Sequence, residues 1–406
     1  MRQTDVDVLI VGGGPAGMVC ACLLARAGLD TLVLERNPNF DREFRGEILQ
    51  PRFHKAMRDL GLYDHLTRYP HEEIDQAHVY FEGRRMGALD LRKLDPASGT
   101  TWWMTQPDLL HALREYGQSS PRFHLWFDAA LKGLRPGAAV VERNGADEEI
   151  RASVIVGADG RYSTVRKLRG IGLEYDHIDL DVIWFLLPRP QGYRHVFSFF
   201  LTQHHNYLIL PKHPNLLQCG LVLQPGEFAA LRQDLERLRE ELRRAHPVFA
   251  EFAAGLRDLS AFRPLKGNTA LASHWAEDGL VLIGDAAHTC SPAGGIGVAV
   301  AVETACVAAD VIRRCFEQRD FSRQRLGEIQ ARREKDVRAV HAIQRNARFM
   351  VRSGGILRRV APRAIWLLSR TGLLPVLARR LLTQRQPLPR SLQRLPAQQA
   401  AHPDIP

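Results

Sequence analysis

The chain has 406 residues and a formal net charge of +10; hydrophobic residues make up 45% of it and charged residues 25%. This length suffices for two domains or one large domain, and the composition is ordinary for a globular protein. No apolar run reaches about eighteen residues, and the first one carries a glycine motif, so we expect neither a membrane-spanning helix nor a secretory signal.

The cysteines show no CxxC pair and no metal-ligand spacing. We therefore expect no metal site, and reduced, buried thiols in a cytoplasmic protein. The scattered positions are Cys20, Cys22, Cys219, Cys290, Cys306 and Cys315.

The positive charge is concentrated near the C-terminus, where no acidic residue occurs between Asp336 and Asp404. Apolar residues with helical spacing alternate with arginines there, and the pattern breaks around 372–375. Such basic amphipathic helices either pack on their own protein, which we favour, or lie peripherally on the inner surface of an anionic membrane. Nucleic acid is not an expected partner, because no recognised binding module accompanies the arginines.

Residues 6–37 form the first strong motif. A buried parallel strand over 6–11, glycines in G-x-G-x-x-G spacing, a helix over about 15–28 and a second strand over 31–34 follow one another. The glycines would allow a tight turn, close approach to a pyrophosphate and close helix packing, and the acid after the second strand would accept from a ribose. Arg36 leaves open whether the nucleotide is FAD or NAD. The predicted site contains Gly12, Gly14, Pro15, Ala16, Gly17, Glu35 and Arg36.

The stretch 38–145 predicts a loop containing Arg45, a helix over 52–60, and two short strands over 77–91 around a turn at 82–83. Thr105 is the expected N-cap of a further helix, which begins with Gln106 and Pro107. Two more strands are expected at 124–126 and 139–142.

Two later motifs also place polar residues at the ends of buried strands. The strand at 154–156 leads into Gly157-Ala158-Asp159-Gly160, and the strand at 280–283 leads into Gly284-Asp285. Open α/β sheets bind ligands at such carboxyl ends. A loop with Pro292, Gly294, Gly295 and Gly297 then precedes a helix that begins near Val298, and a structural role is expected for His288.

The region 179–263 begins with successive antiparallel strands, and a charged helix over 228–246 follows them within it. One face of such a sheet commonly covers a ligand pocket. Trp184, Phe197, Phe199 and Tyr207 are candidates to line it, although core positions are the expected role of each. His195 and His205 are expected in turns or on the surface.

With these motifs in place, the chain resembles the FAD-dependent aromatic hydroxylases, the single-component flavoprotein monooxygenases that include para-hydroxybenzoate hydroxylase. The resemblance rests on GGGPAG at 12–17, GADG at 157–160 with Ser163 and Arg166, and GDAAH at 284–288 with the following glycine loop. It covers most of residues 5–320. FRGEILQ around Arg45 and TQPDLL at Gln106 also resemble family positions near the flavin.

The resemblance implies FAD as cofactor and NAD(P)H as reductant, with NADH or NADPH left open, and no separate nicotinamide domain. Arg45, Gln106, Asp159, Arg166, Gly284 and Asp285 would join the first motif in binding FAD. Pro292, Gly295 and Gly297 would border the flavin ring, where a C4a-hydroperoxyflavin would form. The expected reaction uses O2 to hydroxylate or epoxidise a small aromatic or polycyclic substrate. No acid or base residue can be assigned to it.

The sequence departs from the family pattern at two places. Gly297-Val298-Ala299 replaces the common G-x-N, and Thr304-Ala305 replaces an Asp-Ala pair. Two alternatives therefore stay open: a prenyl-reductase-like flavin dehydrogenase that does not activate oxygen, and a non-catalytic flavin-binding protein. No W-x-W-x-I-P stretch is present, which argues against a flavin halogenase.

The expected fold class is α/β, with a Rossmann-type FAD-binding domain interleaved with an antiparallel-sheet substrate domain. We assign 1–75, 100–178 and 268–330 to the first domain and 76–99 and 179–267 to the second. Residues 331–406 are expected to form C-terminal helices. The oligomeric state stays open.

Overall fold

A computed structural model describes residues 3–41, 46–93, 100–202, 205–231, 233–292 and 294–352, together with 360, 363–364, 366–368, 370–371, 379 and 389–393. Arg45 and most of the basic C-terminal segment therefore lie outside the described residues. In the part of the chain that is described, no helix is long and apolar enough to cross a membrane.

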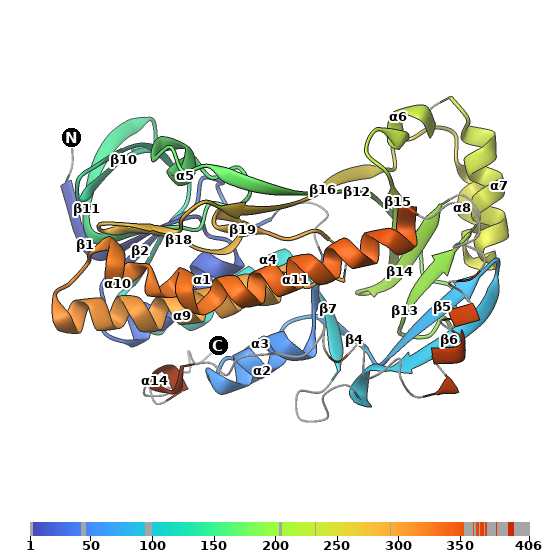
Figure 1. The fold of residues 1–406 in the computed structure, drawn as a ribbon, viewed down its shortest axis with the longest axis horizontal. Helices are drawn as coiled ribbons and strands as arrows, with labels where there is room; N and C mark the ends of the chain where they lie inside the picture. Colours follow the sequence, from blue (N-terminus) through green and yellow to red (C-terminus); the bar gives the residue numbers. More distant parts are fainter. Residues whose placement is uncertain are drawn as a thin grey trace, which may run out of the picture.

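The first sheet is built on parallel strands (Figure 1). β1 (Gln3–Val11) lies at its centre, with β2 (Thr31–Leu34) and β11 (Ala146–Gly157) parallel to it on either side. Both faces are covered at the inner segments Val8–Val11, Thr31–Leu34 and Val154–Gly157, which are therefore buried at every position without alternation. The sheet also contains β8 (Phe123–Trp126), β9 (Ala129–Arg135), β10 (Ala138–Arg143), β17 (Ala276–Glu277) and β18 (Leu280–Leu282).

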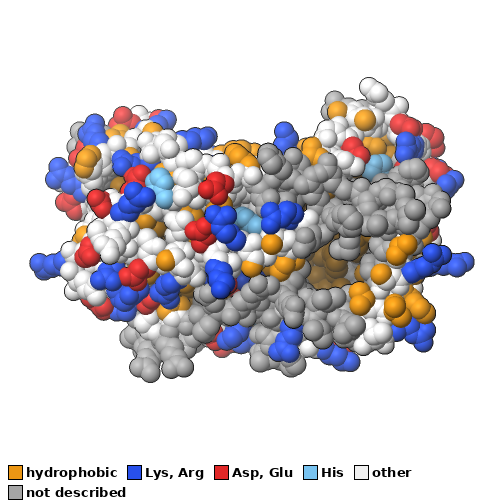
Figure 2. All heavy atoms as spheres, in the orientation of Figure 1, with side chains coloured by type: hydrophobic (Ala, Val, Ile, Leu, Met, Phe, Trp, Pro, Cys, Tyr) orange, Lys and Arg blue, Asp and Glu red, His pale blue; other side chains and the backbone are white. Residues whose placement is uncertain are grey.

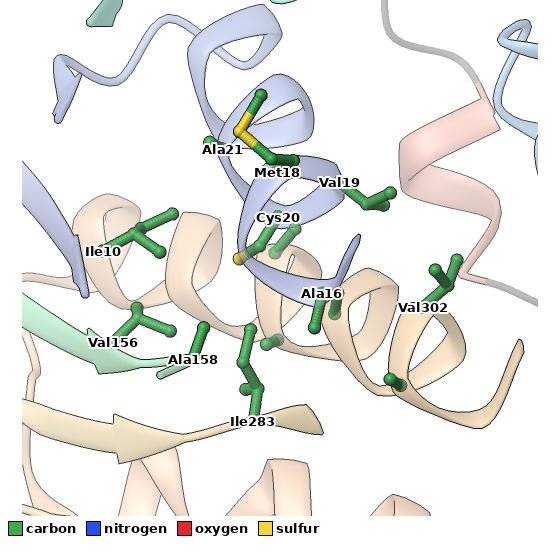
Figure 3. Close-up of a cluster of buried hydrophobic side chains, with 14 of the residues drawn as sticks. Ile10, Ala16, Met18, Val19, Cys20, Ala21, Val156, Ala158, Ile283 and Val302 are labelled. Atoms are coloured by element: carbon green, nitrogen blue, oxygen red, sulfur yellow. The ribbon is translucent and has the colours of Figure 1, made fainter. Parts of the chain in front are cut away.

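Two helices build the main core beside this sheet. α1 (Pro15–Arg26) packs against α9 (Gly297–Gln318), and Figure 3 shows their side chains meeting those of the strands. α1 is buried from Ala16 to Ala25, which explains why its sequence has no polar face. α4 (Gln106–Gln118) also packs on α1, and Thr105 caps it as predicted by accepting from Asp108 N.

The second sheet is antiparallel except where β13 meets β5. Its order is β19 (His288–Thr289), β16 (Arg263–Ala272), β12 (Leu173–Pro188), β15 (Leu216–Leu223), β14 (Asn206–Lys212), β13 (Val196–Leu201), β5 (Gln76–Phe81) and β6 (Arg84–Asp90). The long strands β12 and β16 connect the two halves of the molecule (Figure 1). They run through the predicted domain boundaries at 178 and 268.

The helix predicted over 228–246 is wrong as a single element. The chain forms α6 (Glu227–Leu231) and then α7 (Leu235–Ala245), because Asp234 caps a new helix by accepting from Arg237 N. α7 and α8 (Ala250–Gly255) cover one face of the second sheet.

A small third sheet joins the halves and consists of β3 (Gly46–Leu49), β7 (Thr101–Thr105) and β4 (His71–Ile74). α11 (Glu328–Arg352) runs along α9 and reaches β12 (Figure 1). The other α-helices among the described residues are α2 (Pro51–Asp59), α3 (Tyr63–Leu66), α5 (Thr164–Leu168), α10 (Arg323–Leu326) and α14 (Arg390–Gln393).

Candidate functional site

The three glycine-containing motifs meet at one edge of the first sheet. β2, β1, β11 and β18 are adjacent and parallel, so the residues that follow them lie at the same edge. Backbone hydrogen bonds join these ends: Gly12 N donates to Leu34 O over 2.8 Å, and Ala158 N donates to Val11 O over 2.8 Å. Glu35, Gly12, Ala158 and Asp285 all line one cavity there.

The first glycine motif fits a dinucleotide phosphate, as the space around each glycine shows. A Cβ at Gly12, whose φ is +111°, would lie 2.5 Å from Ala158 O, and one at Gly17 would lie 2.0 Å from Gly12 O. A Cβ at Gly14 would meet nothing within 4 Å, since this glycine faces the cavity. No side chain among the described residues caps α1. Its first N–H groups and its positive end therefore suit an anionic group.

Glu35 holds the position that a ribose-binding acid requires. It is 3% exposed, and its carboxylate accepts from Gly13 N over 3.2 Å and Asn37 N over 3.0 Å. Asn37 Nδ2 donates to the same carboxylate over 2.5 Å, and together these bonds fix it beside the glycine turn. The residues present thus fit the adenosine half of FAD.

The polar side chains of the GADG region mainly hold the local backbone in place. Asp159 lines the cavity, but its carboxylate accepts from Ser163 Oγ over 2.5 Å and from Val165 N over 3.1 Å, at the start of α5. Arg166 does not line the cavity, and the cofactor contact expected for it stays a prediction. It is 4% exposed and donates to Ala286 O over 3.0 Å and to Arg161 O over 2.9 Å, which ties two strand ends together.

The Pro292 loop, which comprises residues 290–292 and 294–297, is held from two sides. Gln344 on α11 accepts from Ser291 N over 3.1 Å and donates to Ser291 O over 2.8 Å. Gln50, just before α2, donates to Gly294 O. Gly295 has φ +59°, and a Cβ there would lie 2.9 Å from Ile48. The loop therefore has a fixed shape at the cavity wall, where Pro292, Gly295 and Gly297 all lie.

A buried cluster of charges supports this region from behind. Arg52 donates to both carboxylate oxygens of Glu303, over 2.7 and 2.6 Å, and Arg333 adds a bond of 2.7 Å. Arg333 also pairs with Asp336 over 3.1 Å. Burial alone would raise the pKa of Glu303, but the two guanidiniums outweigh it and hold that pKa below its usual value. The cluster joins α2, α9 and α11.

The other reactive-looking groups of this region are structural. His288 is buried and bonds Thr304 Oγ1 through Nε2 over 2.9 Å; burial and then the charge of Arg333 lower its pKa to about 3. Burial raises the pKa of the Cys290 thiol to about 12, so it is not a thiolate nucleophile. In the part of the chain that the structure describes, no group of three His, Cys, Asp or Glu could hold a metal ion.

The cavity has a volume of about 1030 Å³ and extends from the strand ends to the second sheet. Figure 2 shows hydrophobic side chains gathered inside a recess between the two halves of the molecule. Most of the predicted site residues line the cavity, whereas Gly17, Gly284 and Arg166 lie behind its wall. Those at the wall are Gly12, Gly14, Pro15, Ala16, Glu35, Arg36, Gln106, Asp159, Asp285, Pro292, Gly295 and Gly297.

One face of the second sheet forms the far part of the cavity, which we call the aromatic chamber. Successive strand residues point to opposite faces, so Val182 and Trp184 line the chamber while Ile183 and Phe185 pack beneath it. Phe197 and Phe199 also line the chamber, although core positions were expected for them. Its walls are Val182, Trp184, Phe197, Phe199, Leu208, Leu210, Gln218 and Val222.

Tyr207 takes the core position expected for it and does not line the cavity. It lies on the opposite face of β14, fully buried against Phe249, and its hydroxyl donates to Glu241 over 3.4 Å. His195 and His205 do not line the cavity either; they pair with Glu72 and Glu241.

Sequence reasoning missed several residues of the site. Glu47 and Ile48 line the cavity from β3, and Glu47 accepts from Gln106 Nε2 over 2.6 Å. Gln50, Gln218 and Gln344 were not singled out either. Glu47, Ile48 and Gln50 carried a usable signal, since they belong with Arg45 to the FRGEILQ stretch that resembles the family.

Comparisons with known proteins agree with this geometry. Residues 5–341 match the family model of the FAD-binding domain. The chain is 34% identical over 379 residues to 6-methylpretetramide 4-monooxygenase of Streptomyces rimosus, covering 90% of this chain and 89% of that protein. It is 27% identical to a flavin-dependent monooxygenase of Mycobacteroides abscessus, covering 74% of this chain and 66% of that one.

Solved structures share the fold at low sequence identity. The p-nitrophenol 4-monooxygenase of Pseudomonas putida superposes with a TM-score of 0.79 at 19% identity, covering 95% of this chain and 100% of that structure. PqsL of Pseudomonas aeruginosa gives a TM-score of 0.75 at 22% identity, with 90% and 100% coverage. These two structures bear on the fold alone.

Proposed function

The chain belongs to the FAD-binding-domain family and is an FAD-dependent monooxygenase, and from this premise we propose that it hydroxylates a planar, polycyclic aromatic substrate. NAD(P)H is the reductant typical of the family. The observation that supports the substrate class is the aromatic chamber, whose Trp184, Phe197 and Phe199 line the same continuous cavity as the Pro292 loop. The relative with 34% identity acts, by its name, on 6-methylpretetramide.

The residues that would hold FAD follow from the fit described above. Gly12, Gly14 and the start of α1 would bind the pyrophosphate, Glu35 the adenosine ribose and Asp285 a hydroxyl of the ribityl chain. Arg45, which lies outside the described residues, and Gln106 would add further contacts. When bound, FAD supplies the redox chemistry, in which NAD(P)H gives two electrons and one atom of O2 enters the substrate while the other leaves as water.

In this reaction the chain's own residues bind and orient the substrate and shield the reacting atoms from water. The apolar side chains of the chamber would exclude water from the reacting carbon and hold the ring plane against the Pro292 loop. Gln344 and Gln50 keep that loop in one shape before the substrate arrives. We assign no general base.

The test compares phenols of increasing ring number. NAD(P)H oxidation, O2 uptake and product mass would be measured with phenol, 1-naphthol and 1-hydroxyanthracene. We expect the tricyclic phenol to give the highest kcat/KM and a product heavier by one oxygen atom. Equal or better turnover of phenol would contradict the polycyclic proposal, while NAD(P)H oxidation without an oxygenated product would favour the reductase alternative.

For the basic C-terminal segment we propose packing on the protein rather than membrane contact. Support comes from its described end, where Leu392 is buried, Arg26 donates to Leu392 O over 2.8 Å, and Ser391 bonds Asp310 over 2.5 Å. We expect no co-sedimentation of the full chain with vesicles containing anionic lipid. Strong, salt-sensitive co-sedimentation would reverse the choice.

A further inference from the structure

We propose that Gln218 determines substrate specificity, because its amide N–H groups bind an oxygen acceptor on the aromatic substrate, either a ring carbonyl or a phenolate. The inference rests on the proposed function, since it places this contact inside the aromatic chamber. The contact would require the substrate to carry an oxygen acceptor, in a chamber whose other described wall residues are apolar.

Strand alternation places Gln218 in the chamber. On β15, Leu217, Cys219 and Leu221 pack into the core beneath the sheet, whereas Gln218 and Val222 line the cavity on the other face. Gln218 is only 3% exposed. A glutamine at such a buried position requires hydrogen-bond partners, because an unsatisfied buried amide is destabilising.

Trp103 fixes the orientation of this amide. The Trp103 indole N–H donates to Gln218 Oε1 over 3.1 Å. An indole nitrogen only donates, so the atom that it contacts is the carbonyl oxygen and the amide cannot be turned around. Trp103 is fully buried on β7, which keeps the donor in place.

The amide nitrogen of Gln218 is therefore the end available to a ligand. No group among the described residues accepts a hydrogen bond from Nε2. Nε2 is also not one of the fully buried polar atoms that lack a hydrogen-bond partner. It retains access to the cavity that Gln218 lines. Two fixed N–H donors at this point select a ligand that presents an oxygen acceptor to them, since a purely hydrocarbon ligand would leave both unpaired.

Other polar groups near the chamber do not make the same selection. Thr101 also lines the cavity, but its hydroxyl rotates and can donate or accept. Arg263 lies on the exposed rim and donates to Ser260 O. Lys212 lies 5.6 Å from the centre of the Trp103 ring and is not part of the described cavity wall. The fixed N–H groups of Gln218 thus make the selection, for the kind of oxygen acceptor that a ring carbonyl or a phenolate presents.

The experiment uses 9-fluorenone and fluorene, which share a planar skeleton and differ in the carbonyl. Binding to the FAD-loaded full chain would be measured from the change in flavin absorbance, so that no turnover is needed. We expect the native protein to bind fluorenone about 5- to 10-fold more tightly than fluorene. Gln218→Leu should remove this preference, and the carbonyl stretch of bound fluorenone should return toward its value in an apolar solvent.

Three further variants sharpen the result. Trp103→Phe should reduce the preference only in part, because the amide stays but loses its fixed orientation. Thr101→Val is the matched control and should leave the preference intact. If Gln218→Leu does not retain FAD, Gln218→Met is used in its place.

Two results would overturn the proposal. If the preference for fluorenone persisted without Gln218, or depended on Thr101 instead, Gln218 would not be the residue that selects the oxygen acceptor. The aromatic chamber itself would be unaffected by that result. Failure of both probes to bind any variant would overturn the aromatic chamber itself, and with it the proposed substrate class.

Discussion

The two ends of the cavity are built in different ways. At the cofactor end, the wall is mostly backbone at the tips of adjacent parallel strands, where Gly12 and Gly17 have almost no room for a side chain and Gly14 opens onto the cavity. At the chamber end, the wall consists of large side chains at alternate positions of antiparallel strands. The cofactor end thus depends on local chain shape, and the chamber depends on register between distant strands.

The supports of the two ends differ as well. Buried charges on three helices stand behind the cofactor end, while an apolar core with α7 and α8 lies beneath the chamber. The cofactor end can therefore be damaged by removing one charge, whereas the chamber tolerates changes of size better.

The largest effect is expected for Glu303→Leu. This change leaves Arg52 and Arg333 buried beside each other without their shared carboxylate. Removing one partner of a buried ion pair costs about 3–5 kcal/mol, and we expect that loss in the free energy of unfolding measured with urea. Glu317→Leu is the control, since the exposed pair of Glu317 with Arg313 contributes less than about 1 kcal/mol. Similar losses in both variants would contradict the special role of the cluster.

Two glycines of the first motif should separate folding from cofactor binding. In Gly17→Ala, the Cβ would meet Gly12 O, and we expect a loss of about 3 kcal/mol in unfolding free energy. In Gly14→Val, the side chain would enter the cavity, so the protein should lose no more than about 1 kcal/mol of stability yet fail to retain FAD. Flavin absorbance after gel filtration measures retention. A yellow Gly14→Val protein would remove this glycine from the cofactor site.

This contrast explains which parts could be predicted from the sequence. The FAD-binding end could be predicted because the residues that it needs lie within short stretches of sequence, such as Gly12 to Gly17. The chamber could not, because Tyr207 and Leu208 are both apolar strand residues, and only the register of β14 decides that Leu208 lines the cavity.

Contacts between segments that are distant in the sequence could not be predicted either. The Trp103–Gln218 bond spans 115 positions, and Gln344 reaches the Pro292 loop from a helix that was assigned to the C-terminal region. The bonds of Arg166 to Ala286 O and Arg161 O, which connect two strand ends, could not be predicted from its place next to a ligand motif either.

Acid should weaken the cofactor end through two buried histidines. Burial lowers the pKa of His54 and of His288 to about 3. The folded protein keeps both neutral, whereas the unfolded chain binds protons near pH 6.5. Their contribution is complete above that pH and is lost as the pH falls toward 3, by about 1.4 kcal/mol per pH unit for each histidine.

Between pH 6.5 and 5 each histidine therefore removes about 2 kcal/mol of unfolding free energy. Urea titrations of the native protein and of His54→Gln and His288→Gln would measure this slope. Each variant should show a shallower loss on acidification. An unchanged slope in both would show that these side chains are protonated in the fold.

The smallest effect tests the register of the chamber directly. Phe199→Leu should weaken binding of 2-naphthol to the FAD-loaded protein about 3- to 5-fold, because an aromatic contact is worth about 1 kcal/mol, and should leave FAD retention unchanged. Tyr207→Phe lies one strand away on the opposite face. It should lower stability by about 1 kcal/mol through loss of the bond to Glu241 and should not alter naphthol binding. If Tyr207→Phe weakened naphthol binding and Phe199→Leu did not, the faces of the second sheet would be exchanged. The ligand would then lie where α7 and α8 now pack, and the substrate class inferred from the chamber would lose its support.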